Sequence, residues 1–198
     1  MKISLILAHP DKNSFNHAIA HTVAEELESI GNEVIFHDLY EEKFNPILPT
    51  SEIPKDACLP PEIQAHCDEI STADGIVIIH PNWWGQPPAI LKGWVDRVIR
   101  PGVAYEFIEE DSGEGIPKGL LKAKFALVLN TSNTPTEREK RVFGDPLEAL
   151  WKKCVFELCG VKIFHRRMFN IIVISSEKDR ENWLVESREI VKRILDDV

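Results

Sequence analysis

Five apolar runs of strand length recur along the chain, and most of them are continuous rather than alternating with polar residues. They cover residues 3–8, 34–36, 75–79, 125–129 and about 161–174. Continuous apolar runs are typical of strands that are buried on both faces, as in a parallel sheet covered by helices. We therefore expect five parallel strands joined by crossover connections.

The segments between these runs carry apolar residues at steps of three or four, the spacing of one face of a helix. These stripes span residues 19–30, 89–99, 147–158 and about 180–195, and the first three end within three residues of a glycine, a common helix terminator. Alternating strands and helices predict an α/β fold, a doubly wound five-stranded parallel sheet with helices on both faces. Flavodoxin-like and Rossmann-like strand orders both satisfy this pattern.

The length of 198 residues suits one domain spanning 1–198, and we find no repeat, low-complexity tract or linker. The Pro- and acid-containing segment 41–61 is interpreted as a long surface excursion after the second strand. A net charge of −9 disfavours sequence-independent binding to nucleic acid, which needs clustered Lys and Arg. The short basic groups at 138–141 and 165–167 leave room only for a local anion site.

Neither a membrane segment nor a secretion signal is expected. No apolar stretch approaches the roughly 20 residues that span a bilayer, and no small-residue cleavage site follows the first apolar run. We therefore expect a cytoplasmic protein without direct membrane insertion. The cysteines, Cys58, Cys67, Cys154 and Cys159, form no Cys-x-x-Cys pair, so we interpret them as reduced and expect no metal site.

Two adjacent tryptophans, Trp83 and Trp84, follow the third apolar run in the stretch His-Pro-Asn-Trp-Trp-Gly-Gln-Pro-Pro at 80–88. Adjacent side chains diverge on a strand and on a helix, so both indoles cannot share one core pocket. The prolines also prevent a central strand from continuing. We expect a loop at the end of a buried strand, where the indoles serve a planar ligand or are simply surface aromatics.

The loop after the first run, residues 9–16, holds neither a dinucleotide fingerprint nor a P-loop. Ser14 stands where a helix should begin, with free backbone N–H groups expected at Phe15, Asn16 and His17, so this is either an anion site or an ordinary helix cap. His9, Ser14 and Asn16 could add side-chain donors. His17 and His21 have a spacing that can hold zinc, but no third ligand completes the pattern, and we expect exposed histidines.

A third polar loop, residues 130–135, follows the fourth run and contains several hydroxyl and amide side chains. It can offer donors to a carbonyl-rich ring edge, although turn-forming residues alone would give the same composition. In parallel sheets, ligands bind beyond the carboxyl ends of the strands, which is where all three loops should lie.

Taken together, these motifs resemble the flavodoxin-like NAD(P)H:quinone oxidoreductase family, the DT-diaphorase group with its bacterial relatives. The resemblance covers roughly residues 3 to 175 in order and spacing. Its pieces are His9-Pro10 with Ser14-Phe15-Asn16, Asp38-Leu39-Tyr40 with Phe44-Asn45-Pro46-Ile47, Pro81 to Gly85, and Pro88-Ala89-Ile90-Leu91-Lys92-Gly93-Trp94 continuing through Arg97-Val98 to Ala104-Tyr105.

The resemblance implies a tightly held flavin, either FAD or FMN, with no catalytic side chain or metal beyond it. The residues implied for the phosphate or pyrophosphate are His9, Ser14, Phe15 and Asn16; those for the isoalloxazine are Pro81, Asn82, Trp83, Trp84 and Gly85; those for its pyrimidine edge are Thr131, Ser132, Asn133 and Thr134. Trp84, Tyr105 and Phe107 would wall the substrate pocket, usually across a homodimer interface.

The implied activity is two-electron reduction of quinones or similar acceptors by NAD(P)H, with hydride passing from the nicotinamide C4 to the flavin N5 in a ping-pong mechanism. Two alternatives stay open: an ancillary regulatory flavoprotein subunit of a membrane ion-efflux system, and a flavodoxin-type electron carrier.

Two departures from the mammalian enzymes of the family bear on the chemistry. Their glycine-rich loop after the fourth strand is followed by a Tyr and a His that assist the reduced flavin. Here Thr131–Thr134 has no glycine, the segment 137–143 has neither Tyr nor His, and Phe143-Gly144-Asp145 occupies the place of His-Gly-Asp. An adenine-binding glutamine is not evident either, which leaves the choice between FMN and FAD open.

Overall fold

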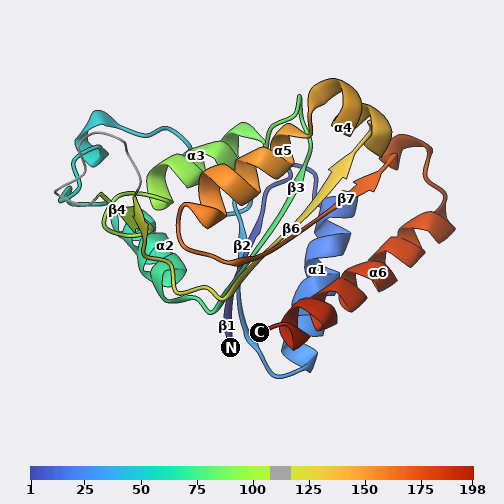
Figure 1. Ribbon diagram of the computed structural model, residues 1–198, viewed down its shortest axis with the longest axis horizontal. Coiled ribbons are helices and arrows are strands. Elements are labelled where there is room, and N and C mark those ends of the chain that lie inside the picture. Colours follow the sequence, from blue (N-terminus) through green and yellow to red (C-terminus); the bar gives the residue numbers. More distant parts are fainter. Residues whose placement is uncertain (108–116) are drawn as a thin grey trace.

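The computed structural model describes residues 1–107 and 117–198 and contains a five-stranded parallel sheet in the order β2-β1-β3-β6-β7 (Figure 1). The strands are β1 (Lys2–Leu7), β2 (Glu33–Asp38), β3 (Gly75–Pro81), β6 (Phe125–Ser132) and β7 (Ile163–Asn170). Counted along this sheet the order is 2-1-3-4-5, the flavodoxin-like one of the two orders left open by the sequence. The predicted doubly wound α/β fold is confirmed.

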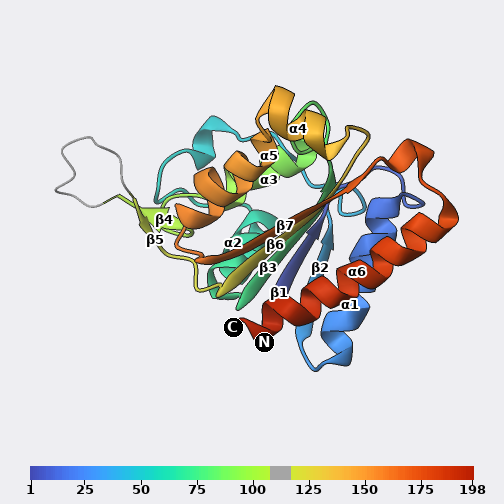
Figure 2. The ribbon, with the colours of Figure 1, turned by 45° about the vertical axis from the view of Figure 1, so that its right-hand side comes forward.

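Helices cover both faces of the sheet (Figures 1 and 2). Helices α1 (Phe15–Ser29) and α6 (Glu177–Asp196) lie side by side on one face. The other face carries α2 (Pro61–Thr72), α3 (Ala89–Val98) and α5 (Pro146–Glu148), which continues into the π-helical segment η2 (Ala149–Glu157). None of the helices in the two described ranges is long and apolar enough to cross a membrane.

Shorter elements lie around this framework. Helix α4 (Thr136–Phe143) stands just beyond the carboxyl end of β6 (Figure 1). Strands β4 (Tyr105–Glu106) and β5 (Lys118–Gly119) form a separate antiparallel pair, and 3₁₀ turns occur at η1 (Thr50–Glu52) and η3 (Ile172–Ile174).

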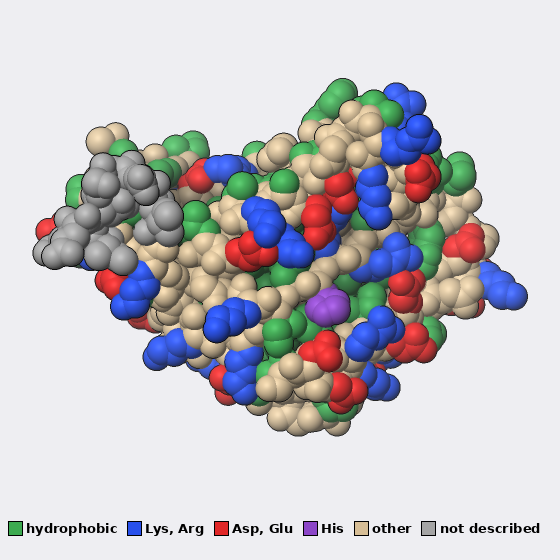
Figure 3. Space-filling model, in the orientation of Figure 1, with side chains coloured by type: hydrophobic (Ala, Val, Ile, Leu, Met, Phe, Trp, Pro, Cys, Tyr) green, Lys and Arg blue, Asp and Glu red, His purple; other side chains and the backbone are tan. Residues whose placement is uncertain are grey.

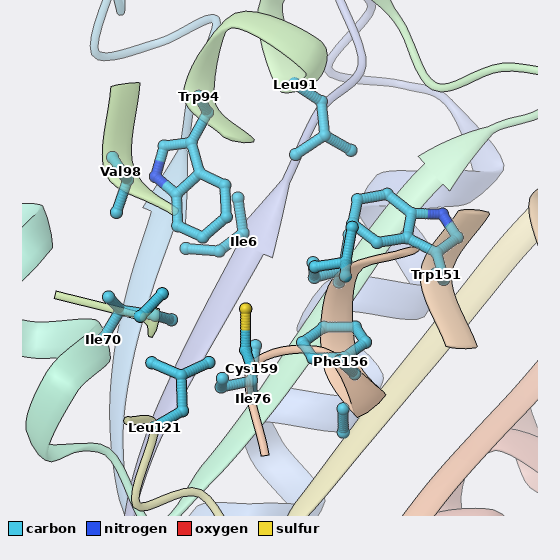
Figure 4. Packing of buried hydrophobic residues seen from close by; sticks show 14 of the residues in the cluster. Ile6, Ile70, Ile76, Leu91, Trp94, Val98, Leu121, Trp151, Phe156 and Cys159 are labelled. Atoms are coloured by element: carbon cyan, nitrogen blue, oxygen red, sulfur yellow. The ribbon is translucent and has the colours of Figure 1, made fainter. Parts of the chain in front are cut away.

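Side chains of the central strands alternate between two cores, one on each face of the sheet. Leu5, Val77 and Leu127 point toward α1 and α6, whereas their sequence neighbours point toward α2, α3 and α5. In the second core Trp94 and Trp151 are both fully buried, one from α3 and the other from η2 (Figure 4). These two indoles are ordinary core anchors, unlike the pair at 83 and 84.

The excursion after β2 is fastened to α3 by two residues of this helix, Gly93 and Arg97. A Cβ on Gly93 would lie 2.2 Å from the carbonyl oxygen of Pro46, so only glycine permits this approach. One turn later the buried Arg97 donates to the carboxylate of Glu52, with Nη2–Oε1 at 2.6 Å, and to the carbonyl of Asn45. Both residues therefore hold the excursion in place instead of contacting the carboxyl ends of the strands.

Two helices lacked a clear signal in the sequence, and one started earlier than expected. Helix α2 buries only a narrow stripe, and α4 is polar over most of its length. Helix α6 begins at Glu177 rather than near Arg180, because Ser176 and Asp179 form a reciprocal capping box. The four cysteines are free, as predicted, with Cys58 and Cys154 exposed.

A partly buried cluster of charged side chains joins β2 to α2 and to the start of the excursion. The two ring nitrogens of His37 donate to Glu42 and Glu69, each at 2.7 Å. Burial alone would lower the pKa of His37, but these two hydrogen bonds outweigh it and raise the pKa to about 9. His66 packs 4.2 Å from the His37 ring, and burial lowers its pKa. His37 therefore acts as a partly buried cation that connects three segments.

This cluster predicts a specific dependence of stability on pH. Because the folded pKa of His37 lies above its ordinary value of about 6.5, its contribution is complete below pH 6.5 and is lost as pH rises through about 9. We expect the wild type to lose on the order of 1–3 kcal/mol more of its unfolding free energy across this window than His37→Gln does. Urea denaturation at several pH values measures the difference.

His165→Gln, which removes a half-exposed histidine whose Nε2 lies 3.9 Å from Asp197, is the matched control. It should keep the wild-type pH dependence. Equal pH slopes for the wild type and His37→Gln would contradict the assignment of a cation at His37.

Candidate functional site

The parallel register of β3 and β6 brings two of the three polar loops together. Pro81 pairs with Thr131 at the carboxyl ends of these strands. Directly beyond, the Asn82 N–H donates to the Thr131 carbonyl at 2.7 Å, so the pairing continues into the loops. Strand β1 lies on the other side of β3 and delivers the first loop to the same edge. Strand order reverses between β1 and β3, which is the switch point where such sheets bind ligands.

The double tryptophan forms a tight turn that holds one indole in solvent. The N–H and C=O groups of Trp83 and Gln86 exchange two hydrogen bonds of 3.0 Å. Both residues between them are left-handed, Trp84 with φ 58° and Gly85 with φ 73°, as in a type I′ turn. Trp84 is fully exposed and Trp83 about half exposed.

This geometry is costly for a tryptophan. A non-glycine residue in the left-handed region is destabilised by roughly 1–2 kcal/mol, and Trp84 buries no surface that would offset this cost. Gly85 cannot be replaced easily either, because a Cβ there would lie 2.8 Å from Pro146. Strained residues of this kind concentrate at ligand sites. The expected loop at a strand end is confirmed, and Trp84 is not a core anchor.

Beside the turn lies a cavity of about 520 Å³, a typical size for a small-molecule site. The residues that line it are Asn82, Trp84, Gly85, Ser132, Asn133, Thr134, Glu139, Phe143 and Pro146. Trp84, Phe143 and Pro146 supply apolar surface, whereas the last residue of β6 and the loop after it supply amide and hydroxyl groups. Such a lining fits a planar ring with apolar faces and polar edges, and a flavin ring has this chemistry.

The turn also contains a backbone donor without a partner. Within the described residues, the Trp84 N–H finds no acceptor, whereas the N–H groups of its neighbours Trp83 and Gly85 are both bonded. Some of the polar side chains opposite already accept hydrogen bonds: Ser132 Oγ from the Thr134 N–H, and Asn133 Oδ1 from the Val173 N–H of η3.

The loop after β1 ends in a capped helix. Ser14 accepts from the His17 N–H and is the N-cap of α1, so the N–H of His17 is not free, contrary to expectation. The first two N–H groups of the helix, Phe15 and Asn16, keep the orientation of an anion site. His9 Nδ1 lies 3.1 Å from the Asp11 nitrogen and 3.2 Å from the Asp11 carbonyl oxygen; when Nδ1 accepts from the N–H, the neutral ring carries its proton on Nε2. Burial lowers the pKa of His9 and favours this neutral form.

Two side chains implied for the cofactor make contacts within the protein. Phe15 is partly buried and packs against Phe169 and Trp183 at the edge of the core. The buried Asn16 donates to Thr131 Oγ1 at 3.0 Å and joins the start of α1 to the end of β6.

The two histidines of α1 also differ from expectation. His17 is buried and pairs with Asp38 at 3.0 Å, while His21 stacks on Phe36. The expectation of two exposed histidines is therefore wrong for His17, because Asp38 at the end of β2 gives it a buried partner.

The aromatic wall implied for the substrate pocket lies apart from Trp84 in this chain. Tyr105 and Phe107 form an edge-to-face pair, with ring centroids 5.6 Å apart, at the β4 end of the molecule (Figure 1). Tyr105 packs partly on the core and Phe107 is exposed. Neither lines the cavity, so their role across a dimer interface stays a prediction.

Three cavity residues had no functional role in the sequence interpretation: Glu139, Phe143 and Pro146. Phe143 and Pro146 flank the left-handed pair Gly144 and Asp145, which an ion pair from Arg166 holds in place. On the molecular surface, hydrophobic atoms gather over α4 beside basic side chains (Figure 3). The Phe-Gly-Asp sequence was visible beforehand, but its place beside Trp84 depends on the fold.

Beneath the cavity, the fully buried His80 accepts from the indole N–H of Trp151 at 3.0 Å and contacts the Pro81 carbonyl through Nδ1. Burial lowers the pKa of His80 to about 4, so it is neutral and supports the strand end without charge. Nearby, Asn130 accepts from Arg166 through Oδ1.

Comparison with known proteins agrees with this architecture. A family model described as a flavodoxin-like fold matches residues 1–193. An uncharacterized NAD(P)H oxidoreductase of Haemophilus influenzae is 35% identical over 89% of this chain and 87% of its own length. NAD(P)H dehydrogenase [quinone] 1 of Rattus norvegicus is 34% identical over 83% of this chain and 66% of its own length. The solved NAD(P)H:quinone oxidoreductase of Methanothermobacter marburgensis superposes with a TM-score of 0.84, at 25% identity, over 98% of this chain and 96% of that one.

The strained, exposed turn predicts an unusual response to mutation. In flavin-free protein, Trp84→Ala should change the unfolding free energy by only about 0.5 kcal/mol, and Trp84→Gly should leave it unchanged or raise it by up to about 1 kcal/mol, because strain is relieved. Trp151→Ala, the buried control, should cost about 3–5 kcal/mol. Thermal or urea unfolding measures all three. A comparable loss for Trp84→Ala and Trp151→Ala would mean that Trp84 is a structural anchor.

Proposed function

The chain belongs to the flavodoxin-like NAD(P)H:quinone oxidoreductase family, and from that premise we propose that it reduces quinones or similar acceptors by two electrons. The donor is NAD(P)H and the cofactor is a flavin nucleotide, FMN or FAD. The whole chain serves as one flavin-binding domain.

The observation that carries this proposal is the exposed Trp84 turn beside the 520 Å³ cavity. A one-electron carrier needs only the edge of its cofactor to be accessible. Here an exposed indole and other apolar side chains line a cavity. This arrangement suits a second planar ligand and favours an enzyme over a carrier.

A bound flavin supplies hydride chemistry; the protein supplies binding, orientation and electrostatics. The Phe15 and Asn16 N–H groups, with His9 Nε2, bind the phosphate at the start of α1. The free Trp84 N–H and the polar groups of Ser132, Asn133 and Thr134 orient the ring edges. Trp84 stacks with the incoming donor or acceptor, and Phe143 and Pro146 exclude water from one side.

Because one cavity has to accept both substrates, NAD(P)H and the acceptor bind in turn, which gives ping-pong kinetics. We further propose a homodimer in which Tyr105 and Phe107 of one protomer complete the cavity of its partner. The exposed Phe107 ring, next to Tyr105, gives an apolar surface for this contact. The proposed setting is the cytoplasm, without direct membrane insertion.

The protein should purify yellow, or bind added FMN or FAD tightly after flavin removal. Chromatography of the released flavin identifies the nucleotide, and quinone-dependent oxidation of NADH and NADPH identifies the donor. Initial rates at several quinone concentrations should give parallel double-reciprocal lines.

In Trp84→Ala, kcat/KM for quinone should fall by up to about tenfold, because an aromatic stacking contact contributes on the order of 0.5–1.5 kcal/mol.

A colourless protein that binds neither flavin would refute the proposal. A flavoprotein without NAD(P)H:quinone activity would instead favour the electron carrier or the ancillary subunit, and co-purification with a membrane ion-efflux protein would select the latter.

A further inference from the structure

Glu139 is a buried acid whose place in the cavity the proposed function does not explain. Its side chain comes from α4, is 2% exposed and lines the cavity beside Trp84 and Gly85. Among the described residues that line the cavity, it is the sole ionisable side chain. Burial of a carboxylate is unfavourable unless it is hydrogen-bonded, so its partner indicates its role.

That partner is Asn82, the first residue of the turn loop. The Asn82 side-chain N–H donates to Glu139 Oε1 at 3.0 Å, and its carbonyl Oδ1 accepts from the Gly85 N–H at 2.9 Å. Glu139 therefore reaches the turn through one amide side chain. The chain of bonds ends at the residue that, with Trp84, forms the strained centre of the turn.

The carboxylate also determines which way the Asn82 amide faces. In the opposite orientation, the amide oxygen would face the carboxylate and the amide NH₂ would face the Gly85 N–H, so that both contacts would be repulsive. An ionised carboxylate accepts hydrogen bonds but cannot donate them. It therefore selects the orientation of the Asn82 amide in which Oδ1 is available to the Gly85 N–H. Backbone pairing of Asn82 with Thr131 fixes its main chain but leaves this choice open.

We propose that Glu139 is a positioning residue: through Asn82 it holds the Trp84–Gly85 turn in the conformation that presents the Trp84 ring and N–H to the cavity. This inference rests on the proposed function in taking the ligand to be a flavin. The acid acts on the loop across the cavity.

Four variants test the proposal with FMN as the probe, added to flavin-free protein. Glu139→Ala leaves the Asn82 amide without its acceptor, and FMN should bind about tenfold more weakly. Glu139→Gln keeps a carbonyl acceptor and should stay within about threefold of the wild type. Asn82→Asp places two carboxylates together and should weaken binding by about tenfold or more.

The double variant Asn82→Asp/Glu139→Gln is the decisive one. The amide NH₂ introduced at position 139 can donate to one oxygen of the carboxylate introduced at position 82, while the other oxygen accepts from the Gly85 N–H. The direction of the bond is reversed and the total charge equals that of the wild type. Binding should return to within about threefold of wild type. Glu137→Ala, at an exposed acid on the same helix, is the control and should change nothing.

Hydrogen exchange of the Gly85 amide in flavin-free protein gives a readout that needs no cofactor. Exchange should accelerate by about fivefold or more in Glu139→Ala and Asn82→Asp, and return toward wild type in Glu139→Gln and the double variant. If Gly85 follows this pattern while wild-type protein binds neither FMN nor FAD, the proposed function fails and the positioning role stands.

Three results would overturn the positioning role. One is unchanged Gly85 exchange in Glu139→Ala. Another is a loss in Glu139→Gln as large as that in Glu139→Ala, which would make the charge itself the important property. The third is failure of the double variant to recover.

Discussion

The site depends on the hydrogen-bond register between β3 and β6. Pairing of Pro81 with Thr131 brings the carboxyl ends of the two strands within one residue of each other, and the Asn82 N–H extends the pairing by one bond. The double-tryptophan turn and the polar loop after β6 therefore face each other across one cavity. A shift of one residue would send each side chain of β3 to the opposite core, so burial on both faces protects this register.

Three tryptophans illustrate how position determines the role of one residue type. Trp94 and Trp151 are buried and hold helices to the sheet, one donating to His66 and the other to His80. Trp84 lies in solvent in a left-handed conformation that a smaller residue would adopt at less cost. Stability therefore does not account for Trp84, whereas stacking against a planar ligand does.

The fold and the loops of the site could be predicted because they depend on local signals: apolar runs, helical spacing, and a proline-flanked pair of indoles that could not share a core pocket. The burial of His17 could not be predicted, because its partner Asp38 lies at the end of a neighbouring strand, β2. The places of Glu139, Phe143 and Pro146 in the cavity could not be predicted either. Helix α4 has no apolar stripe, and the contacts of these residues are formed across the sheet edge. Tyr105 and Phe107 were assigned by resemblance, and within one chain they do not line the cavity.

We propose that the strained turn holds the flavin ring at the carboxyl edge of the sheet. A crystal structure of the protein saturated with its flavin tests this directly. We expect the isoalloxazine to lie between the Asn82–Gly85 turn and residues Ser132–Thr134, with the Trp84 N–H donating to its edge and the phosphate at the N-terminus of α1. A flavin bound at another place, with the Trp84 turn unoccupied, would contradict this proposal.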